Sequence, residues 1–290
     1  MDEPLLTLEK RHDDLLQQVN EQITLDTFDP TNQGLLQQLV EGLGDPRGLI
    51  RLRFAETLGD IGEPATPYLQ TALANHPNVV VRRAAAKTLT LIADERAVPT
   101  LLEAFLTDED TVVRSSSAGA LARTGEAAVP ALLDILASPD QSEDIKGHAA
   151  WALAFIGSEA SEYLYKALDS DSVDVRCAVI GAIAHVAQEK SDEQSCKILI
   201  SALTDPEPTI RATSAAAFAQ INHLPAIPHL VLALQDSDVE VRKAAVSSLG
   251  KLGDASLLDA LRRALQDEAP IIQTLAKLAI NQIEARSLEA

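Results

Sequence analysis

One short segment, GHAAWALAFIG at residues 147–157, holds the side chains best suited to bind another molecule. It contains the single tryptophan, Trp151, together with His148 and Phe155, in a chain whose other aromatic residues are four phenylalanines and three tyrosines. Large aromatic side chains that reach solvent often anchor binding interfaces, because burying them removes much apolar surface from water. The segment is therefore a candidate partner-binding site, provided that its aromatic side chains face outward.

Signatures of catalysis and of metal binding do not occur in the sequence. GxSxG, HExxH, GxGxxG and the P-loop are missing, and the six histidines are scattered without a metal-binding i, i+4 partner set. Cys177 and Cys196 could approach each other in space, but two thiols alone make an incomplete zinc or iron–sulfur site. They are weak metal candidates, and ordinary reduced cysteines are expected.

Composition limits the classes of partner. The formal charge is −19, from 43 acidic and 24 basic residues, and such a field repels phosphate backbones and anionic lipid. No window approaches 18 uninterrupted apolar residues, and MDEPLLTLEK lacks the features of a secretion signal. We expect a cytoplasmic protein with a protein partner, no nucleic acid and no membrane span.

A repeat explains how the chain must position the aromatic segment. The pattern of Val or Ile, then Arg, then an Ala-rich helix recurs in eight copies at steps of 30 to 35 residues, and a second helical pattern precedes each copy. The Arg or its substitute falls at 51, 82, 114, 146, 176, 211, 242 and 273. Neither helix of a pair can bury its apolar stripe alone, so the pairs must stack and share one core.

The predicted fold is therefore all-α, a right-handed α-α superhelix of about eight helical pairs over residues 35–290. Residues 1–34 lie outside the period and are expected to form an N-terminal capping helix, with a partner-binding arm as the alternative. Residues 187–196 lengthen the link between the fifth and sixth copies, either as a contact loop or as a solvated insertion.

A helical wheel indicates which way the aromatic segment faces. Counted from the repeated Arg, the apolar columns project at about 280 to 340°, whereas Trp151 projects at about 140°. His148 and Phe155 lie on the same stripe, and the matching columns of neighbouring copies hold Arg123 and His185. These five residues are the predicted partner-binding set. The alternative is that Trp151 packs locally across Gly119 or Gly181.

The repeat resembles HEAT repeats of the short phycobilisome-lyase type. The resemblance rests on a turn Asp followed six residues later by the Val/Ile-Arg pair. In that family these residues form a structural ladder between neighbouring repeats, and here His76, Ser170, Lys146 and Gln273 depart from the pattern, so the ladder should weaken at repeats 2, 4, 5 and 8. The complete pairs are Asp45/Arg51, Asp108/Arg114, Asp205/Arg211 and Asp236/Arg242.

The resemblance also implies a function. AAWALAFIG is similar to the Ala–aromatic runs of cyanobacterial proteins of this type, which include E/F-type lyases that attach phycocyanobilin, phycobilisome-degradation proteins and a partner of an A-type iron–sulfur carrier. The leading hypothesis is a noncatalytic scaffold, without a cofactor, that engages a phycobiliprotein through its concave second-helix face. The alternatives are a bilin-lyase subunit that uses phycocyanobilin, and a partner of an iron–sulfur carrier. Unlike the E-type lyases, this chain has no aromatic run near its N-terminus, and no obvious bilin nucleophile or acid–base pair.

Overall fold

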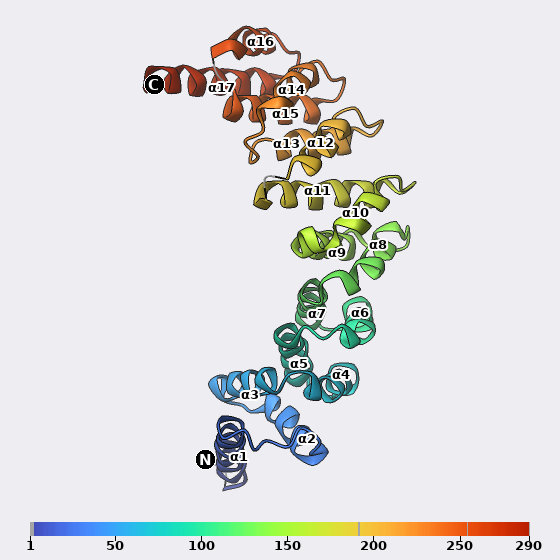
Figure 1. Ribbon diagram of the computed structural model, residues 1–290, viewed down its shortest axis with the longest axis vertical. Helices are drawn as coiled ribbons and strands as arrows, with labels where there is room; N and C mark the ends of the chain where they lie inside the picture. The colour runs from blue at the N-terminus through green and yellow to red at the C-terminus, as the bar shows by residue number, and fades with distance from the viewer. Residues whose placement is uncertain (1–2, 191, 254, 290) are drawn as a thin grey trace. The chain divides into compact units, whose positions relative to one another are not determined.

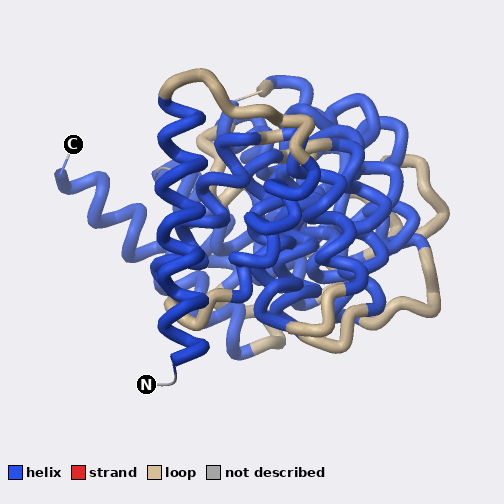
Figure 2. Tube along the Cα trace, turned by 90° about the horizontal axis from the view of Figure 1, so that it is seen from below, coloured by secondary structure: helices blue, strands red, loops and turns tan. Residues whose placement is uncertain are grey.

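The described chain is built from helices. A computed structural model describes residues 3–190, 192–253 and 255–289, and within these ranges every regular element is helical (Figures 1 and 2). The all-α prediction is confirmed. Over the same ranges, no helix has both the length and the apolar character that crossing a bilayer requires.

The helices follow the predicted pairs. After α1 (Glu3–Thr24), the first helices of the pairs are α2 (Gln33–Glu41), α4 (Thr66–Asn75), α6 (Val98–Thr107), α8 (Val129–Ala137), α10 (Ser161–Ala167), α12 (Glu193–Ala202), α14 (Ile227–Ala233) and α16 (Leu258–Ala264). The second helices, which carry the repeated Arg, are α3 (Gly48–Ile61), α5 (Val79–Ile92), α7 (Thr111–Arg123), α9 (Glu143–Ile156), α11 (Val173–Lys190), α13 (Pro208–Ala217), α15 (Val239–Leu252) and α17 (Pro270–Glu289).

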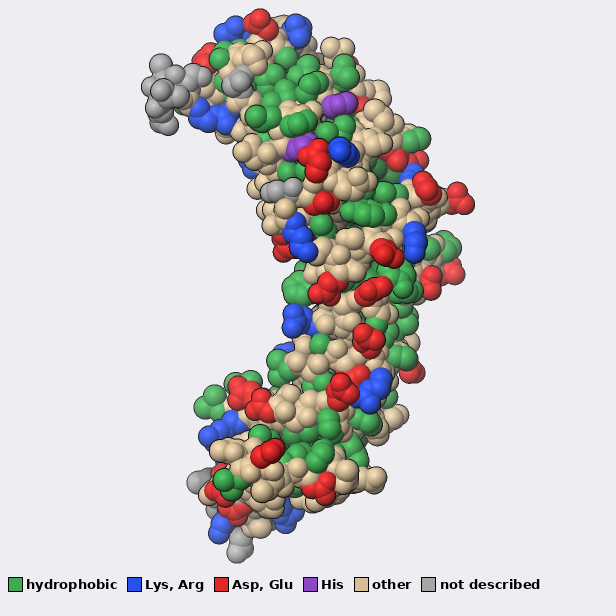
Figure 3. Space-filling view, in the orientation of Figure 1, with side chains coloured by type: hydrophobic (Ala, Val, Ile, Leu, Met, Phe, Trp, Pro, Cys, Tyr) green, Lys and Arg blue, Asp and Glu red, His purple; other side chains and the backbone are tan. Residues whose placement is uncertain are grey.

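The chain divides into two compact units. Unit 1 comprises residues 1–132 with 142–152, and unit 2 comprises residues 133–141 with 153–290. In unit 1, α3, α5 and α7 pack side by side as one layer, while α2, α4 and α6 form the other (Figure 1). In unit 2, the layer of second helices runs through α11, α13, α15 and α17. On the face shown in Figure 3, acidic side chains are scattered over each unit and interspersed with Lys and Arg.

The core is the column of Leu, Ile or Phe that the repeat places seven residues after the repeated Arg. These side chains are buried, as expected where stacked repeats hide their apolar faces. The column consists of Leu58, Leu89, Leu121, Leu153, Ile183, Phe218, Leu249 and Ile280.

Acidic turn residues start several of the second helices. The carboxylate of Asp110 accepts hydrogen bonds from the backbone N–H groups of Val112 and Val113, and Asp238 caps α15 in the same way. Such side-chain acceptors satisfy N–H groups that have no partner within the helix. After α3, Gly62 takes a left-handed φ of 73°, a conformation that glycine adopts without steric cost.

The N-terminal helix is tied to the first pair of the array. Leu15, Leu16 and Val19 of α1 are buried, and α1 packs against α3. His12 Nδ1 lies 2.7 Å from Oδ2 of the buried Asp45, in the turn after α2. α1 is thus joined to the first pair by a polar contact as well as by apolar packing, and the capping role of residues 1–34 stays a prediction.

The lengthened link after the fifth copy is mostly helix. α11 continues to Lys190 and α12 begins at Glu193, so much of the extra sequence in 187–196 extends helices instead of forming a long loop. Asp192 caps α12 by accepting from the backbone N–H of Ser195.

Candidate functional site

A pocket on the surface of unit 1 lies between α7 and the first three turns of α9. It encloses about 620 Å³ and is lined by Ser115, Glu143, Asp144, Gly147, His148 and Trp151. A smaller pocket of about 280 Å³ shares Ser115, Asp144 and His148 with it and adds Phe105 and Arg114. We call the larger one the α7–α9 pocket. The shared residues make His148 a side chain that faces both spaces.

Trp151 supplies the large apolar surface of the α7–α9 pocket. Its side chain is 52 % exposed, so the outward direction that the helical wheel predicts is confirmed. Among the described residues, a Cβ added at Gly119 would meet no heavy atom within 4 Å, so no ring packs across that glycine. The alternative of local packing over Gly119, which lies in the same unit, therefore finds no support.

The small residues of the pocket wall are Gly147 and Ser115. Gly147 is open in the same sense as Gly119, and Ser115 is the residue of α7 that faces the pocket. These two residues leave room beside the indole for a flat group to stack on its face. The charged groups on the wall are the carboxylates of Glu143 and Asp144, which accept hydrogen bonds.

His148 is held in one orientation by two neighbours. Its Nδ1 lies 2.8 Å from the backbone carbonyl oxygen of Asp144, one turn earlier in α9. A carbonyl oxygen can only accept, so Nδ1 carries the proton and Nε2 is the basic nitrogen of the neutral ring. The Phe105 ring meets the imidazole edge-on at 6.2 Å between centroids, and the Asp144 carboxylate lies 3.7 Å from Nδ1.

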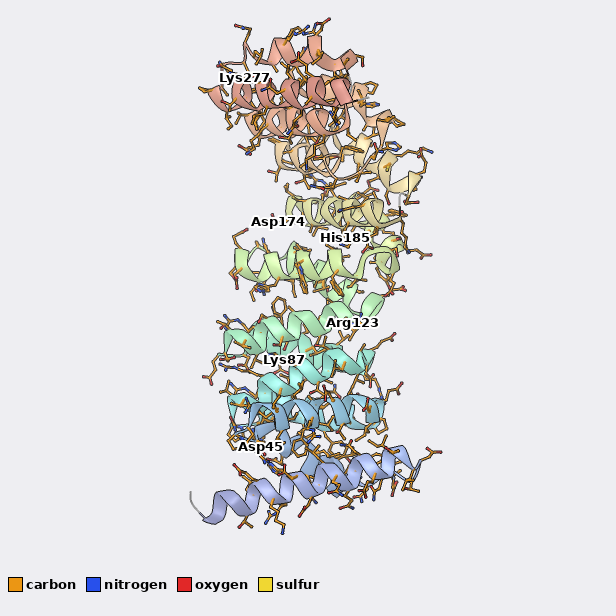
Figure 4. The ribbon with its side chains drawn as sticks, turned by 90° about the vertical axis from the view of Figure 1, so that its left-hand side faces the viewer. Asp45, Lys87, Arg123, Asp174, His185 and Lys277 are labelled. Carbon is orange, nitrogen blue, oxygen red and sulfur yellow. The ribbon has the colours of Figure 1, made fainter. Side chains whose placement is uncertain are left out.

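The other predicted partner-binding residues are placed on three helices. Arg123 is exposed in the last turn of α7, labelled in Figure 4, and does not line the α7–α9 pocket. Phe155, in the last turn of α9, is 50 % exposed, as the wheel predicts. His185 lies on α11 with Nδ1 3.8 Å from Glu189. Phe155 and His185 belong to unit 2, so the pocket is described by the unit 1 residues alone.

The two cysteines have unlike surroundings. Cys196 is 2 % exposed, and burial raises the pKa of its thiol, which disfavours the thiolate that metals bind. Cys177 is partly exposed, with Sγ 3.7 Å from the Thr213 hydroxyl. Across the part of the chain that the structure describes, His, Cys, Asp and Glu side chains do not gather in threes or more around a possible metal position.

Arginines of the second helices bond to the backbone of the turn six residues earlier. Arg51 Nη1 donates to the carbonyl oxygen of Asp45 at 2.6 Å, and Arg82 donates likewise to the carbonyl of His76 at 3.2 Å. This contact uses the backbone, so it does not require an acidic residue in the turn. The predicted pairs that show it are Asp45/Arg51, Asp108/Arg114, Asp205/Arg211 and Asp236/Arg242.

The carboxylates of the turns pair with the arginine of the preceding repeat. Arg242 Nε lies 2.8 Å from the carboxylate of Asp267, and this hydrogen bond lowers the pKa of Asp267 below its usual value. The arrangement recurs in Arg82–Asp108 at 2.9 Å, Arg211–Asp236 at 2.7 Å and, more loosely, Arg176–Asp205 at 3.6 Å. At repeat 2, where His76 replaces the turn acid, the structure gives Arg51 no carboxylate within 4.0 Å among the described residues.

Several of these residues do not appear among the sequence candidates. Arg82, Arg176 and Asp267 were outside the predicted ladder because their own copies lack either the turn acid or the arginine. The constant spacing could have found them, since Asp267 follows Asp236 by one period. Asp144 was also missed, although its place four residues before His148 is the helical spacing at which side chains meet.

Comparison with known proteins identifies the repeats. The profile of HEAT repeats matches residues 32–122, 129–198 and 196–281. The chain is 40 % identical over 235 residues to the bilin biosynthesis protein MpeU of Synechococcus sp. (strain WH8020), covering 81 % of this chain and 79 % of that protein. It is 25 % identical over 254 residues to deoxyhypusine hydroxylase of Candida albicans, covering 86 % of this chain and 79 % of the enzyme.

A solved structure shares the fold. Kap95p, in a complex with RanGDP, matches 94 % of this chain and 43 % of its own length with a TM-score of 0.52 at 14 % identity. At that identity the likeness concerns the helical-repeat fold alone. Together with the family profile and the relative from Synechococcus, it establishes that this chain belongs to the HEAT-repeat family.

Proposed function

We propose that this chain acts in bilin biosynthesis, at the step that attaches a bilin to a phycobiliprotein. The support is its 40 % identity to a bilin biosynthesis protein over four fifths of its length. The structural observation that carries the proposal is the half-exposed Trp151 on the wall of the α7–α9 pocket. Its indole offers a flat apolar face near Gly147 and Ser115, the small residues of the wall, and that shape suits the planar pyrrole rings of a bilin.

The polar groups of the pocket fit the same ligand. The pyrrole N–H groups of a bilin are hydrogen-bond donors, and the carboxylates of Glu143 and Asp144 are acceptors on the pocket wall. The propionate groups of a bilin need a positive charge, and Arg114 lines the adjoining pocket. The α7–α9 pocket thus offers a complement to the rings and to their N–H groups, and the adjoining pocket offers one to the propionates.

Substitution of the tryptophan tests this proposal. Trp151→Ala should weaken the binding of phycocyanobilin at least tenfold, since truncation of an aromatic anchor costs about 2 kcal/mol of binding. Quenching of the single tryptophan in the wild-type protein, and bilin absorbance that co-elutes with each protein, measure the affinity. Leu52→Ala is the matched control, because Leu52 is 53 % exposed on α3 of the same unit. Equal affinities for the wild type and Trp151→Ala would refute a bilin site at this pocket.

A noncatalytic scaffold for the phycobiliprotein is the second candidate. It is favoured by Phe155, which is exposed on α9 one turn beyond Trp151 and is a typical interface anchor. In that case Phe155→Ala and Trp151→Ala should both weaken capture of the apo-phycobiliprotein while bilin stays unbound by the chain alone. Pull-down with and without phycocyanobilin separates the two functions.

A further inference from the structure

We infer that His148 is a general base of the α7–α9 pocket, which takes the proton from the thiol of an incoming protein as that thiol adds to a bilin. The inference rests on the proposed function and assigns a chemical step to it. The observation behind it is the fixed tautomer of His148. Because Nδ1–H donates to the Asp144 carbonyl at 2.8 Å, the lone pair is on Nε2, at the opposite edge of the ring.

The surroundings of His148 match what a base needs. The side chain is 39 % exposed and lines two adjoining pockets, so a reacting group can reach it from solvent. Phe105 contacts the ring edge-on, and the Asp144 carbonyl holds Nδ1, so the imidazole cannot turn freely. The Asp144 carboxylate also lies 3.7 Å from Nδ1. A base oriented by a third group is the usual arrangement for activating a nucleophile.

The charged and titratable groups facing His148 come from both helices that form the pockets. Asp144 and Glu143 lie on its own helix, and Arg114 lies on α7. Two carboxylates against one guanidinium leave the surroundings negative, which disfavours a thiolate approaching without a proton acceptor. A base that removes the proton as the carbon–sulfur bond forms avoids the separate thiolate.

The step balances without an oxidant or a reductant. The S–H proton passes to Nε2 of His148, and the sulfur bonds to one carbon of an exocyclic C=C of the bilin. The π electron pair then takes a proton at the adjacent carbon, and the imidazolium supplies it. The sum is addition of S–H across a double bond, and the imidazole returns to its neutral form.

The test separates the base from the bilin site. His148→Asn keeps an N–H donor near the position of Nδ1 but has no counterpart of Nε2. We expect it to bind phycocyanobilin within twofold of the wild type and to attach the bilin to the cysteine of an apo-phycobiliprotein about 100-fold more slowly. His229→Asn, at an exposed histidine of α14, is the control and should keep the wild-type rate.

The pH dependence identifies the role of His148. The wild-type attachment rate should rise with pH as the imidazolium loses its proton. In His148→Asn this rise in the pH–rate profile should be absent. Asp144→Asn removes the carboxylate but keeps the backbone carbonyl that orients the ring, so it should keep the pH-dependent rise that His148→Asn lacks. An unchanged rate in His148→Asn would overturn the inference and leave the proposed function standing. Failure of the wild type to bind the bilin or to promote its attachment would overturn both.

The tautomer can be checked without any activity. Nitrogen-15 spectra of the histidine-labelled protein at neutral pH should show His148 with the proton on Nδ1, and His148→Asn assigns the resonance. A proton on Nε2 would leave no base at the pocket and would refute the inference directly.

Discussion

The two units use the same arginine ladder to different extents. In unit 2, Arg176, Arg211 and Arg242 each reach a carboxylate of the following turn, so the ladder passes through consecutive repeats. In unit 1, Arg82 has such a partner in Asp108, whereas the partners of Arg51 within the described residues are backbone carbonyls. Unit 1 is also the unit that holds the α1 contact and the α7–α9 pocket.

The repeated arginine makes two kinds of contact: a bond to a backbone carbonyl, which both units share, and an ion pair with a carboxylate, which some repeats lack. The bond from the arginine to a backbone carbonyl is present in both units, including at His76 and at Ser170. The carboxylate pair is added where the next turn supplies an acid. We infer that the backbone bond fixes the geometry of each turn, and that the carboxylate pair adds stability between repeats.

Removal of an arginine should have the largest effect in unit 2. Arg242→Ala leaves the carboxylate of Asp267 without its partner, and the two side chains are only 7 % and 10 % exposed. Breaking a buried ion pair from one side costs about 3 kcal/mol. Arg51→Ala should cost about 1 kcal/mol, because it loses only hydrogen bonds to carbonyls. Urea denaturation followed by helical circular dichroism measures both, and equal losses would contradict the comparison.

Acid should weaken the α1 contact of unit 1. Burial raises the pKa of Asp45, but hydrogen bonds from Arg47 and His12 outweigh it and lower the pKa to about 2. A depressed pKa stabilises the fold above the unfolded value of 3.8, and this stability is lost as the pH falls from about 4 to about 2. The contribution at neutral pH is about 2 kcal/mol.

The variant Asp45→Asn isolates that contribution. Its unfolding free energy should depend less on pH between about 4 and 2 than that of the wild type, while both fall together from other carboxylates. Hydrogen exchange of α1 amides locates the loss. If Asp45→Asn retained the full wild-type pH dependence, Asp45 would not be the group that ties α1 down.

The smallest expected effect comes from restoring a turn acid in unit 1. His76 Nδ1 accepts from the backbone N–H of Asn78 at 3.0 Å, and Asp108 accepts from Asp110 in the same way at 2.8 Å. His76→Asp can keep this bond and offer a carboxylate to Arg51. We expect a gain of about 0.5 kcal/mol, read as a rise in Tm. His76→Ala is the control and should not show the gain.

The fold was largely predictable from the sequence, and the site only in part. The 31-residue period located both helices of each pair, because a buried column such as Leu58, Leu89 and Leu121 leaves a clear apolar signal. Exposure of Trp151 followed from the same wheel. The orientation of His148 could not be predicted, because it depends on a backbone carbonyl and on Phe105, 43 residues away in sequence. Neither contact corresponds to a recognisable motif in the amino-acid sequence.

The ladder illustrates a second limit of sequence reasoning. The spacing correctly associated each turn Asp with the Arg six residues later, but the atoms that meet are the guanidinium and the backbone oxygen. The side chains of Asp108, Asp205 and Asp236 reach the arginine of the preceding repeat instead, and the side chain of Asp45 bonds to Arg47 and His12. Sequence spacing gives the residues and leaves open which of their groups are in contact.

Because that guanidinium bond is made to a peptide oxygen, the turn residue can change identity while the connection persists. A histidine or a serine can occupy the position, as at 76 and 170, and the local geometry survives. The turn residue of a single repeat can therefore be replaced by a residue with different chemical properties. The bond from the arginine to the turn is then retained without a second substitution in another repeat.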